Sequence, residues 1–263
     1  MKSHDQFYSL AQIYDIAFDF KDIPSECLYL RSAFRSYTGR APTSFLDLAA
    51  GPALHAIEMA KAGLKAGATD LSPAMVQYGL EKSLRAGVTI TYDVSNITSF
   101  VTKDVYDFAG IFMDSTSYLL TNEDFCSHLS SVARALNSDG LYVLEMAHPR
   151  DVFSVGSSTT SSWEVERDGI WTSVAWSDPN DYFDPVTQIS ETTVALKYRI
   201  EGVEKEIVET APQRCFTANE IKALVKAEGS FEIIDIIGAL KQGIPFSNDK
   251  SAWRMIPFLK KRQ

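Results

Sequence analysis

Short apolar runs alternate with longer stretches of helical periodicity between residues 44 and 146. This rhythm is typical of βαβ units, in which each strand of a parallel sheet is followed by a helix that packs on it. Ser72 and Pro73 form a typical helix start, a capping hydroxyl followed by proline. Helices are also expected to begin near His55 and Asn122. The predicted strands are Ser44–Leu48, Lys65–Asp70, Thr89–Asp93, Tyr106–Met113 and Gly140–Met146.

The flanking segments have other periodicities. Residues 6–37 carry apolar side chains at near-helical spacing and predict one or two amphipathic helices. After Pro149 the pattern alternates with a period of two, around Asp168-Gly169 and Glu201-Gly202, which predicts two hairpins. A helix over 217–228 and strands over 231–240 and 252–259 complete the α/β pattern. The predicted divisions are an N-terminal helical lid (1–43), a core (44–148), an antiparallel β insertion (149–214) and the remainder of the core sheet (215–263).

Composition narrows the class of protein. The chain has 263 residues, 45% of them hydrophobic, and a formal net charge of −9. Such a chain is expected to be a soluble globular protein, and its charge argues against nucleic acid as a partner. No segment is apolar over a length that would span a membrane, and the three widely spaced cysteines indicate neither a disulfide framework nor a metal site. We therefore expect a cytoplasmic protein without a metal, either a monomer or a homodimer.

Acidic residues recur at the ends of the first three predicted strands. Asp47 precedes a turn of small residues that contains Gly51, Asp70 ends the second strand, and Asp93 ends the third. Open α/β sheets bind their ligands at the carboxyl ends of the strands, and an acid about 20 residues after a glycine turn can accept hydrogen bonds from ribose hydroxyls. The turn has only one glycine, Gly51, so the three-glycine fingerprint of dehydrogenases is absent.

This ordering of acids resembles the class I S-adenosylmethionine (SAM)-dependent methyltransferases, in their small-molecule branch. The resemblance implies a Rossmann-like, seven-stranded α/β sheet with SAM as the cofactor. It implies that Asp70 binds the ribose and that the turn lies against the methionine arm of SAM. The residues that the resemblance assigns to the cofactor are Tyr14, Arg31, Asp47, Ala49, Gly51, Asp70, Leu71, Met75, Asp93, Val94 and Met113.

The same resemblance implies an acceptor site above the fourth strand. Asp114, Ser115 and Tyr118 are expected to face the reacting centre, and Tyr14 is expected to reach over the sulfonium from the lid. A histidine after the fifth strand, His148, is a candidate general base. For each side chain a purely structural role, as a buried turn or a helix stripe, stays open.

Three functions remain compatible with these residues. The first is transfer of the SAM methyl group to an amine or hydroxyl of a small molecule. The second consumes SAM without an acceptor, by elimination or by intramolecular attack of its amine, which gives azetidine-2-carboxylate and methylthioadenosine. The altered turn at Ala49, Pro52 and Ala53 is the only sequence feature that favours this second function. The third is a SAM-binding protein without turnover.

Overall fold

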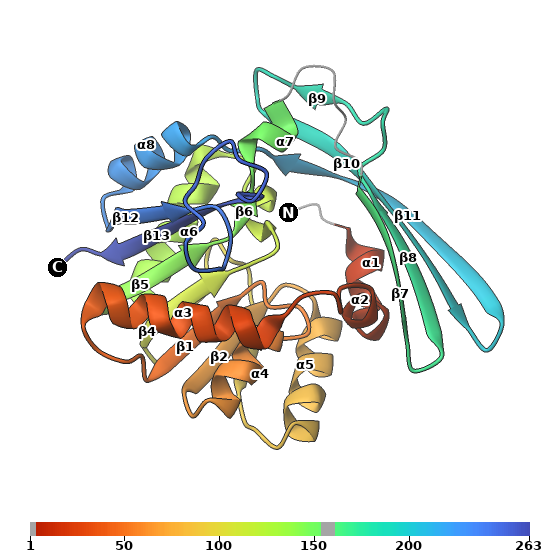
Figure 1. The fold of residues 1–263 in the computed structure, drawn as a ribbon, viewed down its shortest axis with the longest axis horizontal. Coiled ribbons are helices and arrows are strands. Elements are labelled where there is room, and N and C mark those ends of the chain that lie inside the picture. Colours follow the sequence, from red (N-terminus) through yellow and green to blue (C-terminus); the bar gives the residue numbers. More distant parts are fainter. Residues whose placement is uncertain (1–3, 154–160) are drawn as a thin grey trace.

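The structure, a computed structural model, describes residues 4–153 and 161–263. Residues 1–3 and 154–160, which belong to the predicted lid and insertion, lie outside the described part. A helix-covered central sheet and a curved antiparallel sheet face each other, and the N-terminal helices lie between them (Figure 1). Among the described residues, no helix combines the length and apolarity that a membrane span requires.

The central sheet has the strand order β12-β13-β5-β4-β1-β2-β3, with the short β6 paired to β13. Its five strands from β3 to β5 are parallel, and β13 is antiparallel to both neighbours. The predicted α/β class and sheet are confirmed. The strands are β1 (Ser44–Leu48), β2 (Lys65–Asp70), β3 (Thr91–Val94), β4 (Tyr106–Ile111), β5 (Leu136–Leu144), β6 (Met146–Ala147), β12 (Phe231–Ile237) and β13 (Arg254–Lys261).

Helices bury an apolar layer on each face of this sheet. On one face, α3 (Ile23–Thr38) and α4 (Leu54–Lys61) pack with residues of β1 and β13, and α5 (Pro73–Arg85) packs beside α4 on β2 and β3. On the other face lie α6 (Asn122–Ala135) and α8 (Ala218–Glu228). Burial of these aliphatic and aromatic side chains stabilises the sheet and holds its carboxyl edge in one arrangement.

The insertion forms the second sheet, in the order β11-β10-β8-β7. Both hairpin predictions are confirmed: Asp168 and Gly169, like Glu201 and Gly202, have positive φ at both central positions, as two-residue hairpin turns require. The elements are α7 (Pro149–Phe153), β7 (Ser161–Arg167), β8 (Ile170–Trp176), β9 (Phe183–Asp184), β10 (Ile189–Ile200) and β11 (Val203–Arg214).

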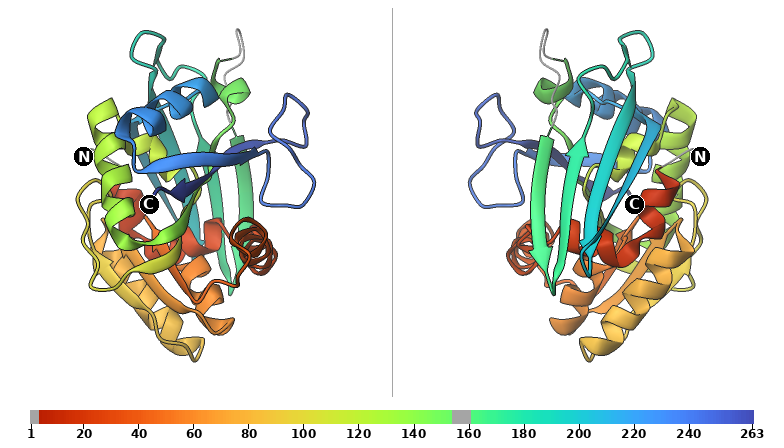
Figure 2. Two further views of the ribbon diagram at one scale, coloured as in Figure 1. Left: turned by 90° about the vertical axis from the view of Figure 1, so that its left-hand side faces the viewer. Right: turned by 90° about the vertical axis from the view of Figure 1, so that its right-hand side faces the viewer.

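Two short helices, α1 (Asp5–Ser9) and α2 (Ala11–Ala17), pack against the inner face of this second sheet (Figure 2). Phe7 and Phe18 share one apolar cluster with Val174 and Leu196. The N-terminal region therefore has three helices, counting α3, where the sequence pattern predicts one or two. The break at Phe18–Asp22 separates the lid, α1 and α2, from the core helix α3.

The start of strand β5 differs from its prediction for a physical reason. The turn predicted at Asn137–Gly140 is part of β5, which begins at Leu136 instead of Gly140. Tyr106 pairs with Leu136 and Phe108 with Leu141, so residues 137–140 form a bulge between two pairings with β4. The turn-forming residues thus bend a strand and do not precede it.

Candidate active site

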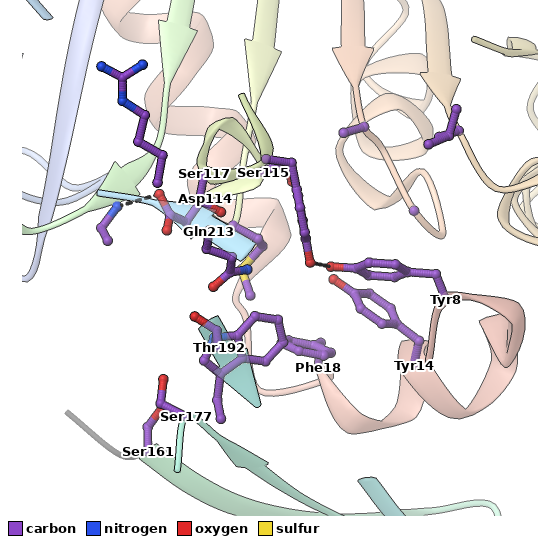
Figure 3. Close-up of a pocket in the computed structure, with 18 of the residues that line it drawn as sticks. Tyr8, Tyr14, Phe18, Asp114, Ser115, Ser117, Ser161, Ser177, Thr192 and Gln213 are labelled. Carbon is purple, nitrogen blue, oxygen red and sulfur yellow. Dashed lines mark hydrogen bonds between the residues drawn. The ribbon is translucent and has the colours of Figure 1, made fainter. Parts of the chain in front are cut away.

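A cavity of about 1180 Å³ lies between the carboxyl ends of the core strands and the second sheet. The core contributes Gly51, Asp70 and Asp114, the lid contributes Tyr14, and the insertion contributes Trp176. Tyr14 and Asp114 are among the residues labelled in Figure 3. The cavity therefore lies where open α/β sheets bind ligands, and three separate parts of the chain enclose it.

The turn after β1 is held against Asp70. The Gly51 N–H donates to Asp70 Oδ2 (2.8 Å), and the Tyr92 hydroxyl donates to the Gly51 carbonyl (2.5 Å). Ala49, Gly51 and Ala53 all have positive φ, which costs an alanine more than a glycine. These hydrogen bonds hold the strained turn in place and keep its backbone against the cavity.

Asp70 lines the cavity from the end of β2. Its Oδ2 accepts the Gly51 N–H and its Oδ1 accepts the Ser72 N–H, and the Leu71 N–H also bonds this carboxylate. Two carboxylate oxygens offer about four acceptor positions, so capacity for a ligand hydroxyl remains. Burial raises the pKa of Asp70. Leu71 also lines the cavity and is 42% exposed, so it presents an apolar surface to the cavity.

Four predicted cofactor residues, Arg31, Met75, Asp93 and Val94, line neither this cavity nor the smaller one beside it. Met75 is fully buried next to the position of Gly51. Asp93 and Val94 lie at the exposed end of β3, where Asp93 pairs with Thr69 and Val94 pairs with Asp70.

A smaller cavity, of about 60 Å³, adjoins the first on the other side of Tyr14 and Gly51. Asp47 lines it, and burial raises the pKa of this carboxyl to about 7, although the Ala56 N–H donates to it. Lys21 lines it as well, whereas the predicted Arg31 lines neither cavity. The cation at this end of the site is thus Lys21.

Lys21 belongs to a buried ionic network. Its Nζ lies 3.1 Å from Glu145 Oε2 and 3.2 Å from Glu26 Oε1, and Arg254 Nε lies 3.4 Å from Glu145 Oε1. Burial alone would raise the pKa of Glu145, but Lys21 and Arg254 outweigh it and hold the pKa at about 2. Lys21, Glu145 and Arg254 were not predicted from the sequence, because Glu145 lies 124 positions from Lys21 and is also far along the chain from Arg254.

The turn after β4 presents its polar groups to the main cavity. Met113 and Asp114 both have positive φ, and the Met113 N–H donates to Glu145 Oε2 (3.0 Å). Asp114 Oδ1 accepts the Ala147 N–H (2.8 Å), and burial raises the pKa of this carboxyl to about 6. Ser115 lines the cavity beside them, so the three predicted residues of this turn do lie together at the site.

A hydrogen-bond chain with a defined direction joins the lid to Tyr118. His4 Nε2 lies 3.0 Å from the Thr192 carbonyl, which can only accept, so Nε2 carries the proton. Burial lowers the pKa of His4, so its Nδ1 is unprotonated and accepts from the Tyr118 hydroxyl (2.8 Å). Tyr118 in turn accepts from the Tyr8 hydroxyl (2.9 Å; Figure 3). The Gln213 side chain also hydrogen-bonds the Tyr118 hydroxyl, so three side chains hold this hydroxyl in place.

Polar contacts tie the lid to both of its neighbours. Asp15 is 1% exposed and lies 2.6 Å from Lys82 Nζ of the core and 2.6 Å from Arg167 Nη2 of the insertion. The Trp163 indole N–H donates to the Ala17 carbonyl (2.6 Å). Tyr14 stacks on Phe18 with 4.4 Å between ring centroids and faces the turn at Gly51. Tyr14 therefore lines both cavities, at the place where they adjoin.

His148 does not face the cavity. Its Nε2 lies 3.0 Å from the Ser247 carbonyl, its Nδ1 accepts the Arg150 N–H (3.1 Å), and its ring packs on Phe246. Both ring nitrogens are thus used in holding the chain after β6. The prediction of His148 as a general base finds no support, because the described residues use both of its ring nitrogens and His148 lines neither of the two cavities.

Comparison with known sequences gives one domain match and one curated relative. Residues 45–140 match the family model described as a methyltransferase domain. A protein of Geobacillus sp. (strain WCH70) that bears a provisional methyltransferase name is 26% identical over 118 residues. That match covers 45% of this chain and 48% of the relative, so the chain spans about half the length of the curated relative that it matches.

Comparison with solved structures extends the likeness to the whole chain. A SAM-dependent methyltransferase from Clostridium acetobutylicum ATCC 824 superposes with a TM-score of 0.79, at 17% identity, over 98% of this chain and 100% of that one. A sugar N-methyltransferase from Streptoalloteichus sp. ATCC 53650 superposes with a TM-score of 0.74, at 17% identity, over 95% and 93% of the two chains. At such identities these matches establish a shared fold.

Proposed function

We propose that the protein is an enzyme that transfers the methyl group of SAM to a small-molecule acceptor, at an amine or a hydroxyl. The proposal rests on the match of residues 45–140 to the methyltransferase domain model and on the fold that the whole chain shares with a SAM-dependent methyltransferase. The observation that carries the proposal is a cavity with two ends. One end has the acids and the backbone turn that suit SAM, and the other has room and polar groups for a second molecule.

In the proposed complex, Asp70 accepts the two ribose hydroxyls and Leu71 packs on the adenine. The methionine arm enters the smaller cavity, where its ammonium meets Asp47 and its carboxylate meets Lys21. The sulfonium then lies under Tyr14. An aromatic face attracts a cation by up to about 2 kcal/mol when water is excluded.

Chemistry at this site needs orientation more than it needs a reactive side chain. The acceptor atom attacks the methyl carbon while the carbon–sulfur bond breaks on the opposite side, so the acceptor must lie in line with that bond. Tyr118, which lines the cavity, is proposed to contact the acceptor, because His4, Tyr8 and Gln213 hold its hydroxyl in one position. The lid and the insertion exclude water from this centre.

The volume of the main cavity favours an external acceptor over cyclisation of SAM. A pocket for one small ligand typically measures about 300–1,000 Å³. The main cavity alone measures about 1180 Å³, and the smaller cavity adjoins it. An enzyme that only cyclised SAM would have no use for the additional space between Asp114 and Trp176.

The test is to identify the product that contains adenosine. The protein is incubated with SAM alone and with SAM plus a panel of small amines and alcohols, and the products are separated by mass spectrometry. S-adenosylhomocysteine that forms only with an acceptor supports the proposal. Methylthioadenosine from SAM alone would assign the protein to the cyclising or eliminating class, and SAM binding without any product would make it a binding protein.

A further inference from the structure

Glu145 contacts the walls of both cavities, although it lines neither of them. It is 1% exposed and lies between β5 and β6. Its Oε2 lies 3.1 Å from Lys21 Nζ in the smaller cavity, and its Oε1 lies 3.4 Å from Arg254 Nε in the main cavity. Its Oε2 also accepts the N–H of Met113, a residue that lines both cavities. One buried carboxylate therefore joins the two walls.

Two carboxylates share the ammonium of Lys21. Glu145 Oε2 lies 3.1 Å from Lys21 Nζ, and Glu26 Oε1 lies 3.2 Å from it. An ammonium has three N–H donors, so a ligand carboxylate in the smaller cavity can still bind Lys21. Such a ligand meets one positive and two negative charges, and charges of like sign repel strongly where water is excluded. Lys21 alone therefore offers a ligand carboxylate little net attraction.

Arg254 offsets one of these negative charges from the opposite side. With it, the group formed by Lys21, Arg254, Glu26 and Glu145 contains two cations and two carboxylates. Its Nε is buried and has no hydrogen-bond partner among the described residues, because the contact with Glu145 is an ion pair at 3.4 Å. That distance leaves room for Arg254 to approach Glu145 when a ligand carboxylate shares the charge of Lys21.

Resting on the proposed function, in which Lys21 meets the carboxylate of SAM, we propose that Glu145 and Arg254 are positioning residues for the methionine arm. Glu145 holds Lys21 at the smaller cavity, and Arg254 neutralises Glu145 from the wall of the main cavity. Neither residue touches the arm itself. The wall of the acceptor cavity thus contributes to the affinity for the cofactor, through a carboxylate that the two cavities share.

Calorimetry compares two ligands, S-adenosylhomocysteine, which has the arm, and methylthioadenosine, which lacks its ammonium and carboxylate. In Arg254→Met the ratio of the two affinities should fall about tenfold, because Glu145 is no longer neutralised and repels the ligand carboxylate. Arg254→Lys keeps the charge and should restore most of the loss. The control Arg214→Met removes a cation of the same cavity that pairs with Glu220 instead, so the ratio should change less than about twofold.

A double-mutant cycle tests whether Glu145 transmits the effect. In the Glu145→Gln background, Arg254→Met should change the affinity ratio less than about twofold, because no carboxylate is left to neutralise. An undiminished effect in that background would show that Arg254 acts on the arm directly, which contradicts the inference. An unchanged ratio in Arg254→Met alone contradicts it as well.

Nuclear magnetic resonance of the wild-type protein gives a second readout, which does not depend on the stability of Arg254→Met. The Nε–H signal of Arg254, identified by its absence in Arg254→Lys, should move downfield when S-adenosylhomocysteine binds, because a shorter contact with Glu145 deshields this proton. Methylthioadenosine should leave the signal in place. Equal shifts with both ligands, or none with either, would overturn the inference. Failure of the wild-type protein to bind S-adenosylhomocysteine at all would instead count against the proposed function.

Discussion

The buried carboxylates of this protein differ in whether a cation accompanies them. Glu145 lies between Lys21 and Arg254, and its pKa falls to about 2. Asp47 and Asp114 form no ion pair among the described residues. Burial outweighs the nearby charges of His55 and Arg254 and the backbone N–H that donates to each carboxyl, and it raises their pKa values to about 7 and about 6. The first arrangement stabilises the fold. At Asp47 and Asp114 a desolvated carboxyl remains with which a cationic ligand can pair. The free energy of unfolding is therefore lower than it would be if a cation of the protein paired with each carboxyl.

The pKa of Asp47 leads to a prediction about stability. A carboxyl whose pKa is raised in the folded state binds more protons there than in the unfolded chain, so the free energy of unfolding falls as pH rises from about 4 to 7. Asp47→Asn removes this contribution. Its stability relative to the wild type should therefore increase between pH 4.5 and pH 8, measured by urea unfolding without ligand.

Asp107→Asn is the matched control, because Arg40 and Thr43 hold the pKa of Asp107 below its usual range against the effect of burial. This group titrates below the window, so the variant should show a deficit in stability that is constant from pH 5 to pH 8. A relative stability of Asp47→Asn that does not change with pH would contradict the assignment of a raised pKa.

Asp70 should carry much of the cofactor affinity. Asp70→Ala leaves the ribose hydroxyls and the Gly51 N–H without an acceptor, which is expected to cost about 1–3 kcal/mol, or several-fold to a hundredfold in affinity for SAM. Calorimetry measures the loss. Glu81→Ala, which removes an exposed carboxylate from α5, should leave the affinity unchanged. Equal affinities in both variants would count against Asp70 as the ribose ligand.

Site residues that directly end or follow a strand can be predicted from the sequence. Asp47, Asp70 and Asp114 belong to this group, since topology alone brings the carboxyl ends of parallel strands together. Lys21, Glu145, His4 and Arg254 do not, because each depends on side-chain contacts between distant segments. His148 also follows a strand end, yet its ring turns to Ser247, and no local pattern encodes that choice.

At the scale of elements, the two lid helices are too short to be stabilised by their own backbone hydrogen bonds. Helices α1 and α2 have five and seven residues, too few to be stable alone. Their position depends on the apolar cluster shared with β8 and β10 and on the ties at Asp15. The lid therefore closes the site only because the insertion contacts it.

Asp15→Asn should open the lid without unfolding the core. Loss of the charge weakens the contacts with Lys82 and Arg167 together, and charge-assisted hydrogen bonds contribute about 1.5–3 kcal/mol each. Amide hydrogens of residues 11–17 should exchange about 10- to 100-fold faster, while those of β1 keep their rates. In the control Asp19→Asn, an exposed pair with Arg167 is lost and exchange should change little. Unchanged exchange in Asp15→Asn would show that apolar packing alone holds the lid.

The elements themselves follow closely from periodicity and turn chemistry. Strands β1 and β2 have the predicted bounds, and the two hairpins turn at the predicted dipeptides, since each signal is local. The strand β5 begins before its predicted start because a bulge absorbs the turn residues, and this depends on pairing with β4. The division of the N-terminal region into a lid and a core helix depends on the second sheet, which lies more than 140 residues further along the chain.

At the scale of the molecule, the protein has separate apolar cores. Three buried clusters belong to the helix-covered sheet, and a fourth is formed by the lid and the insertion. The cavity lies between the fourth cluster and the other three, so a bound cofactor would bridge units that otherwise have distinct cores. Ligand binding should therefore increase the cooperativity of unfolding as well as the stability.

The tryptophans make this measurable. Trp163, Trp171 and Trp176 are in the insertion, and only Trp253 lies elsewhere. In urea, the midpoint of the tryptophan fluorescence change should come before that of far-UV circular dichroism, which reports chiefly on the core helices. Saturation with S-adenosylhomocysteine should bring the two midpoints together. Coincident midpoints in the free protein would show that the four clusters unfold as one unit.

The lid can dock only on segments that are synthesised long after the lid itself. His4 bonds a residue 188 positions away and Gln6 bonds one 203 positions away, so the ribosome must complete β11 before the first helices can dock. At about 5–20 residues per second, the lid waits roughly 10–40 s after its synthesis. During that interval Phe7 and Phe18 are exposed to other chains and to chaperones. The lid is thus placed only after the insertion has been synthesised, although it is made about 200 residues earlier, and the cavity beneath it stays open until then.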